Sequence, residues 1–211
     1  MQPVTLYTAV QSSVRPGWAG VPVRGRVTVK NTVESFKSED KAAFISQAAE
    51  RVWSGIQSGA WLNNPGILSE FAILMFADLK KFRYYYWFAF PSFVLPAGLE
   101  LASRERAGEK LSPALLDSVA GCLTQEVGVT LLVVTGDEAR SVPLASLPSQ
   151  SDLGTCLLCV ADPAQHPAHP GWPARNLLLA AAAARPGGSV RLLCVRTRSC
   201  LVISLVLCLT F

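Results

Sequence analysis

The chain of 211 residues lacks the glycine-rich loops that hold nucleotides in most nucleotide-binding folds. None of its 15 glycines stands two positions from another, so the dinucleotide fingerprint G-x-G-x-x-G is absent. A phosphate loop ending in Gly-Lys-Ser/Thr and a G-x-S-x-G nucleophile elbow are absent too. These turns need glycine because the backbone must adopt shapes that other residues resist. The sequence therefore argues against ATP binding, dinucleotide binding and serine hydrolase chemistry.

Charge is also scarce, at 16% of residues, and histidine occurs only twice. The net charge of +4 has a local origin, because the first thirty residues carry four bases and no acid: Arg15, Arg24, Arg26 and Lys30. The remaining sequence is neutral. Nucleic-acid binding needs a clustered basic face, so the sequence predicts no nucleic-acid partner.

We expect no signal peptide at the amino end, since residues 1–10 contain neither a basic region nor a long apolar run. The six cysteines lie mostly in apolar stretches, which is typical of reduced thiols in a cytoplasmic protein. We expect residues 1–24 to form an unstructured leader, with a short strand at 25–29 at its end.

The most distinctive feature is aromatic density. Ten of the eighteen aromatic residues fall within 71–93. The pattern favours a hairpin, with strands at 71–77 and 82–90 around a turn at 78–81. Alternation puts Phe82, Tyr84, Tyr86, Phe88 and Phe90 on one face of the second strand. We expect this two-faced hairpin to pack between layers of the protein.

Helical periodicity is clearest at 38–57, where Ser38 is the expected cap and apolar residues recur every four positions. A second helix is expected from Ser112-Pro113 to about residue 126. Residues 95–110 and 136–154 read as loops around a strand at 127–135.

The last part of the sequence predicts a strand at 155–161, a helix at 172–185 and a strand at 190–195, which together make a parallel βαβ unit. The fold class is therefore mixed α/β, with an aromatic hairpin and helices followed by a βαβ unit. We expect two small subdomains in a folded region at 25–196, with a boundary near 96–111. Residues 197–211 form an apolar tail that is short for a membrane anchor. The favoured interpretations are a buried or mispaired strand, or an aberrant terminus from altered processing.

Four residues have ligand types that suit zinc: Cys156, Cys159, His166 and His169. Positions three apart on a strand point to opposite faces, so the two cysteines should not share a metal. The spacing is also shorter than that of a zinc finger. We expect two buried thiols and two surface histidines, with neither zinc nor redox chemistry.

The hairpin offers two further candidate sites. Asp78, Lys80 and Lys81 could form a functional charged turn, but a solvated hairpin tip is the favoured interpretation. The run from Tyr84 to Trp87 could stack on bases, but core packing is favoured because basic neighbours are few. The sequence thus predicts no catalytic, cofactor-binding or metal residues.

Three blocks resemble a known family: residues 31–37 (NTVESFK), 76–81 (FADLKK) with the Tyr-Tyr-Trp-Phe run after it, and 169–176 (HPGWPARN). They are similar in order and spacing to the amino-terminal domain of the autophagy E1-like enzyme, which activates ubiquitin-like modifiers. The resemblance covers about residues 25–196.

The resemblance implies a noncatalytic module that recruits E2-like conjugating enzymes for autophagosome formation, in the cytoplasm or at the pre-autophagosomal structure. ATP binding, the catalytic cysteine and the homodimer belong to a carboxy-terminal domain of that family, so this chain is not expected to be an enzyme or to dimerise. A membrane partner is not expected either.

Both ends depart from the family pattern, at residues 1–24 and after Arg196, and the loop before Trp172 has an extra His-Pro-Ala. The chain therefore looks like a truncated isoform with atypical ends. Two alternatives stay open at this point: a membrane-associated variant held by the apolar tail, and a small zinc-binding protein.

Overall fold

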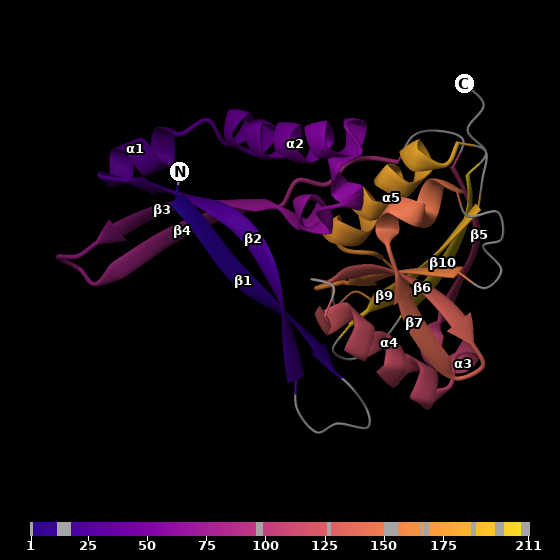
Figure 1. Cartoon of the computed structure of the whole chain (residues 1–211). Coiled ribbons are helices and arrows are strands. Elements are labelled where there is room, and N and C mark those ends of the chain that lie inside the picture. The colour runs from indigo at the N-terminus through magenta and orange to yellow at the C-terminus, as the bar shows by residue number, and fades with distance from the viewer. Residues whose placement is uncertain are drawn as a thin grey trace.

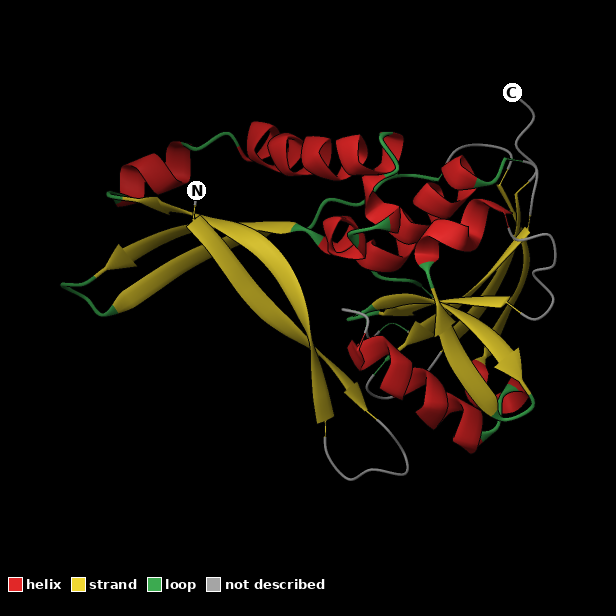
Figure 2. Ribbon diagram, in the orientation of Figure 1, coloured by secondary structure: helices red, strands yellow, loops and turns green. Residues whose placement is uncertain are grey.

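The chain folds into two β-sheets with helices packed on them (Figures 1 and 2). The computed structural model describes residues 2–11, 18–95, 99–125, 128–149, 156–164, 166, 169–186, 189–196 and 201–207. The first sheet has four strands in the order β1-β2-β3-β4, and the second has six in the order β5-β10-β9-β8-β6-β7. The predicted mixed α/β class is confirmed, and the chain passes from one sheet to the other between residues 89 and 99.

The first sheet begins with β1 (Gln2–Gln11) and β2 (Trp18–Lys30), which pair antiparallel. β2 then runs parallel to β3 (Phe71–Asp78), which forms the predicted hairpin with β4 (Arg83–Ala89). The expected unstructured leader at 1–24 is therefore wrong for the described residues 2–11 and 18–24. Alternating valines around Arg24 and Arg26 are a strand signal that the nearby glycines and prolines obscured.

Two helices, α1 (Val33–Ser38) and α2 (Lys41–Gln57), lie along one face of this sheet (Figure 1). Asp40 caps α2 by accepting hydrogen bonds from the backbone N–H groups of Ala42 and Ala43. The predicted single helix from Ser38 is therefore wrong at its start, because Asp40 is the better-placed cap and Ser38 ends α1. Phe44, Ala48, Val52 and Ile56 are buried, as the four-residue period predicted.

The 3₁₀ segments η1 (Ala60–Leu62) and η2 (Pro65–Ser69) lead from α2 into β3. The elements of the second sheet and its helices then follow in chain order: β5 (Leu99–Arg106), α3 (Ala107–Lys110), α4 (Pro113–Gln125), β6 (Val129–Thr135), β7 (Glu138–Val142), η3 (Leu144–Ser149), β8 (Cys156–Ala161), α5 (Trp172–Ala184), β9 (Ser189–Val195) and β10 (Leu201–Leu207).

Two loop predictions are wrong in this half. Residues 95–110 contain β5 and α3, and 136–154 contains β7 and η3. Among the described strands, β5 pairs with β10 alone, about a hundred residues later in the chain, so its polar sequence carried little local signal. β7 is a short edge strand whose polar composition resembles that of a loop.

The predicted βαβ unit is confirmed, because β8 and β9 pair in parallel and α5 connects them. All six residues of β8 are buried, since α5 packs on one face of the sheet and α4 on the other. Apolar residues on both faces of a strand indicate a central position in a covered sheet.

The described part of the apolar tail, Leu201–Leu207, forms β10 between β5 and β9, and both pairings are antiparallel. In this structure the segment is not a membrane anchor, because its backbone pairs with a strand on each side within the sheet. Among the described residues, no helix is long and apolar enough to cross a membrane.

Candidate functional site

The β3–β4 hairpin has two faces with different surroundings. On one face, the aromatic rings of β4 meet the helices: the ring centroids of Phe36 and Tyr85 lie 6.2 Å apart, and those of Phe44 and Trp87 lie 5.9 Å apart in an edge-on arrangement. Ala89 is fully covered on this side. This face is therefore part of the core, as the predicted alternation requires.

The opposite face of β4 is open. Four aromatic side chains follow one another along it, with exposed fractions of 57%, 51%, 44% and 38%: Tyr84, Tyr86, Phe88 and Phe90. We call these four residues the aromatic row. Successive ring centroids lie 6.5, 6.2 and 5.8 Å apart, so the rings contact one another in sequence. The expectation that the hairpin packs between layers is wrong, because among the described residues only the helical layer covers it.

The last residue of the row, Phe90, packs against α5, a helix of the second sheet. The ring of Phe90 lies 4.5 Å from that of Trp172, the first residue of α5, and 6.0 Å from that of Phe71. Phe71 is fully buried and faces Gly25 on β2, where a Cβ would come within 2.5 Å of the phenyl ring. Gly25 thus lets Phe71 pack flat against the sheet beneath the end of the row.

A buried amide fixes the geometry at this end. The side chain of Asn176 on α5 is fully buried and donates hydrogen bonds of 2.9 Å to the carbonyl oxygens of both Leu68 and Pro91. Its own oxygen accepts a 3.2 Å hydrogen bond from the N–H of Phe93. One side chain therefore ties α5 to η2 and to the segment after β4. The row consequently projects from a rigid base.

A buried ion pair orders the start of α5. The Arg196 guanidinium donates hydrogen bonds of 2.7 and 3.0 Å to Oδ2 of Asp162, and both side chains are almost wholly excluded from solvent. Asp162 also accepts from the backbone N–H of Gly171, the residue before α5, while Arg196 donates to the carbonyl oxygens of His166 and His169. The loop before Trp172 is therefore held by a satisfied charged network.

The four zinc candidates do not come together. Cys156 belongs to the apolar cluster on the α5 side of the sheet and Cys159 to the cluster on the α4 side, as their spacing predicted. The rings of His166 and His169 stack on each other, with centroids 4.5 Å apart, in an exposed loop. In the part of the chain that the structure describes, no group of three metal-ligating side chains is found.

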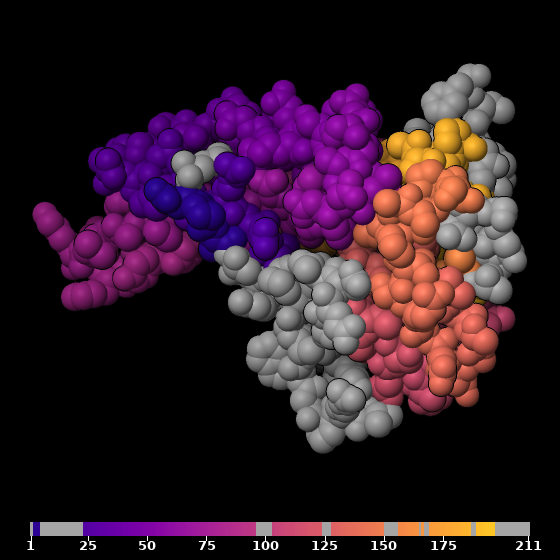
Figure 3. Space-filling view, viewed as in Figure 1, coloured from indigo at the N-terminus to yellow at the C-terminus, as the bar shows by residue number. Residues whose placement is uncertain are grey.

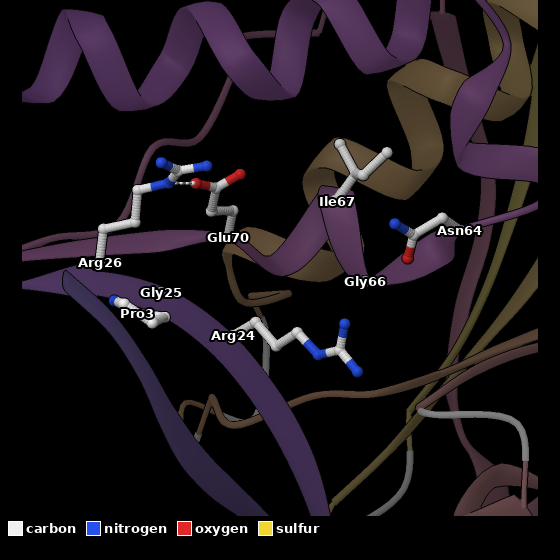
Figure 4. A pocket seen from close by; sticks show the side chains of 8 residues that line it. All are labelled: Pro3, Arg24, Gly25, Arg26, Asn64, Gly66, Ile67 and Glu70. Carbon is white, nitrogen blue, oxygen red and sulfur yellow. Dashed lines mark hydrogen bonds and ion pairs between the residues drawn. The ribbon is translucent and has the colours of Figure 1, made fainter. Parts of the chain in front are cut away.

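A pocket of about 390 Å³ lies between β2 and η2 (Figure 4). Glu70 at its edge accepts hydrogen bonds from both Arg26 (3.2 Å) and Arg51 (2.6 Å), and Arg24 and Asn64 also line the pocket. The carboxylate is thus committed to two arginines, and the pocket has no group placed for acid–base or nucleophilic chemistry among its described lining residues.

The hairpin turn is solvated, as predicted. Lys81 is 70% exposed and lies 3.9 Å from Asp78, too far for a strong ion pair.

Taken together, the open aromatic row, its rigid base and the absence of catalytic geometry in the described residues suit binding of another macromolecule. Sequence reasoning found the row but missed its exposure, and it missed the roles of Asn176, Asp162 and Arg196.

Comparison with known proteins identifies relatives that match most of the chain. Residues 4–209 match the family model described as "Ubiquitin-like modifier-activating enzyme ATG7 N-terminus". The human ubiquitin-like modifier-activating enzyme ATG7 is 37% identical over 193 residues, and the rat enzyme is 35% identical over 192. Each alignment covers 84% of this chain and 27% of the relative, so the chain spans about a quarter of the length of the curated relatives it matches.

Two solved structures share the fold. The Kluyveromyces marxianus Atg7NTD superimposes with a TM-score of 0.63 at 18% identity, covering 97% of this chain and 78% of that one. The same domain in the Kluyveromyces marxianus Atg7NTD–Atg10 complex gives a TM-score of 0.61 at 20% identity, covering 96% and 76%. At such identities the likeness concerns the fold.

Proposed function

Because this chain belongs to the family of ubiquitin-like modifier-activating enzyme ATG7 amino termini, we propose that it is a noncatalytic module that recruits E2-like conjugating enzymes for autophagosome formation. The partner is an E2-like enzyme of the Atg10 kind, since a family member's domain has been crystallised with Atg10. Adenylation of the modifier and the catalytic cysteine belong to the part of the relatives that this chain does not match. The module acts in the cytoplasm or at the pre-autophagosomal structure.

The observation that carries the proposal is the aromatic row. Isolated exposed apolar residues are ordinary on protein surfaces, but four consecutive exposed rings on one face of an edge strand are not. Tyrosine is enriched among the residues that dominate protein–protein binding energy. Phenylalanine is enriched in interfaces, and both residues supply a large contact area. The row is therefore the docking surface that we assign to the E2-like partner.

The rigid base favours the same interpretation. Each ring contacts the next one along the row, and the last ring packs against Trp172 and Phe71. Little side-chain freedom remains to be lost when a partner covers the row, which reduces the entropic cost of association. The tyrosine hydroxyl groups add polar contacts at the end nearest the hairpin turn.

The test is capture of purified Atg10-type enzyme by this chain, with affinities measured by titration. Replacing Tyr86 and Phe88 together by serine should weaken binding at least about tenfold, the loss expected when central aromatic anchors are truncated. The matched control is Trp53→Ser, because Trp53 is 40% exposed but lies on α2, on the helical side of the sheet.

Circular dichroism and thermal melting should show that the double variant keeps its fold. Unchanged affinity in a folded Tyr86→Ser/Phe88→Ser protein would exclude the aromatic row as the docking surface. No measurable binding by the folded wild-type chain would exclude the recruiting function itself.

A further inference from the structure

The tip of the β3–β4 hairpin is the most protruding part of the described chain. Figures 1 and 3 show it standing clear of the neighbouring elements at one end of the molecule, beyond α1. Its two apolar residues are largely exposed, Leu79 to 69% and Phe82 to 87%. A protruding tip of this kind offers its apolar side chains outward.

Phe82 is unusual for its backbone as well as its exposure. Its φ of 51° lies in the left-handed region, and among the described residues it is the only one other than glycine with a positive φ. That region favours glycine and asparagine, and a bulky residue there is strained. None of the ring contacts within the described structure involves Phe82. Neither turn geometry nor packing therefore accounts for a phenylalanine at this position.

The charges around the tip are mainly positive. Lys80, Lys81 and Arg83 are all exposed, and Asp78 is the one carboxylate of the turn. On α1, the helix nearest the tip, Glu34 and Lys37 offset each other. Lys30 at the end of β2 is already paired with Glu39. The tip thus presents three cations and one anion around two apolar side chains.

We propose that this hairpin tip is a peripheral membrane-binding element that inserts Leu79 and Phe82 into the headgroup region of an anionic lipid surface. Lysine and arginine near such a surface are attracted to anionic lipids, and their long side chains can lie at the interface while apolar neighbours insert. This activity is separate from capture of an E2-like enzyme by the aromatic row.

The shape of the tip favours a lipid surface over a protein. A protein partner would need a pocket to receive Phe82, whereas a fluid bilayer adapts to a convex apolar group of any outline. We expect the membrane binding to be weak. A single myristoyl chain gives an association constant of only about 10⁴ M⁻¹, and two inserted side chains bury less apolar surface than that chain. We therefore expect reversible binding that appears at high lipid concentration and falls as salt screens the cations.

The experiment is flotation of the purified chain with phosphatidylcholine vesicles, with or without about 30% phosphatidylserine to supply the anionic surface. The wild-type chain should float with the anionic vesicles and much less with the neutral ones. Phe82→Asn combined with Leu79→Ser should lower the bound fraction at least about fivefold, since both inserted groups are lost. Asparagine suits the left-handed conformation, so this variant should keep the hairpin.

Matched control variants distinguish binding by the tip from nonspecific binding through other exposed apolar or charged side chains. Val94→Ser removes a side chain that is 92% exposed in the segment after β4, and Lys110→Gln removes an exposed charge on α3. Both should float like the wild type, while Lys80→Gln/Lys81→Gln should float less. Equal flotation of the tip variants and the wild type would overturn the proposal.

The same variants are also tested for capture of the Atg10-type enzyme. If Phe82→Asn/Leu79→Ser abolishes capture while flotation is unchanged, the tip belongs to the protein interface and the membrane proposal is wrong. If flotation falls and capture by the aromatic row persists, the two surfaces act independently, as proposed.

Discussion

The carboxylate of Asp162 and the guanidinium of Arg196 meet at 2.7 Å inside the protein, although 34 positions separate them in the sequence. Their side chains are 0% and 3% exposed. Each end of the pair is also hydrogen-bonded to backbone groups of the loop before α5, so neither charge is left uncompensated. Arg196, the last residue of the predicted folded region 25–196, is therefore part of the buried interior of the protein.

Breaking this pair should strongly destabilise the protein. Arg196→Met should lower the free energy of unfolding by about 3–5 kcal/mol, because Asp162 would remain buried without its partner. Urea denaturation followed by circular dichroism measures the loss. Lys110→Gln, which removes an exposed pair with Glu105, should cost less than about 1 kcal/mol. Equal effects of the two substitutions would contradict the assignment.

Asn176 should be equally hard to replace. Asn176→Leu keeps the approximate size of the side chain but leaves the carbonyl oxygens of Leu68 and Pro91 without this donor. The free energy of unfolding should fall by about 2–6 kcal/mol, since two buried carbonyl oxygens lose a donor and each such loss costs about 1–3 kcal/mol. Thermal melting gives the comparison. The exposed Asn63 serves as the control, and Asn63→Leu should leave the melting temperature nearly unchanged.

Adjacent residues of β4 should behave oppositely. Trp87→Ala removes a ring that packs edge-on against Phe44 and should cost about 2–4 kcal/mol of stability. Tyr86→Ala removes a half-exposed ring of the aromatic row and should cost less than about 1 kcal/mol. Chemical denaturation of the two variants measures both losses of stability. Large losses for both would indicate a hairpin covered on both faces, as the sequence predicted, and not on one face only.

Phe82→Asn should leave the stability unchanged or raise it by up to about 1 kcal/mol, because asparagine tolerates the left-handed backbone better than phenylalanine does. Differential scanning calorimetry of the variant and the wild type gives the sign. A marked loss of stability would mean that the phenyl ring supports the fold, which its exposure of 87% argues against.

Zinc should have no effect on the fold. Cys156 and Cys159 face opposite sides of β8, so a single ion cannot reach both thiols without tearing the strand out of the sheet. Adding zinc or a strong chelator should leave the melting temperature within experimental error. A chelator-sensitive transition restored by zinc would revive the small zinc-binding alternative.

Several elements could be predicted because their signal is local. The apolar period of α2, the proline after Ser112 at the start of α4 and the continuous apolar run of β8 all specify their structure over a few neighbouring residues. Elements with non-local partners were missed. β5 pairs with β10 across about a hundred residues, and β1 joins β2 in a segment whose glycines and prolines suggested a leader.

The same distinction applies to the candidate site. Alternation along β4 determined which aromatic side chains share a face, and the sequence by itself determined the family resemblance and the opposite orientations of Cys156 and Cys159. Which face stays open was decided only by the tertiary structure, because α1 and α2 cover one side of the sheet and no described element covers the row on the other. Burial depends on what packs from elsewhere in the chain, and no local pattern encodes that. Tertiary packing likewise brought Asp162 to Arg196 and Asn176 to Leu68, and these contacts hold the row on a fixed base.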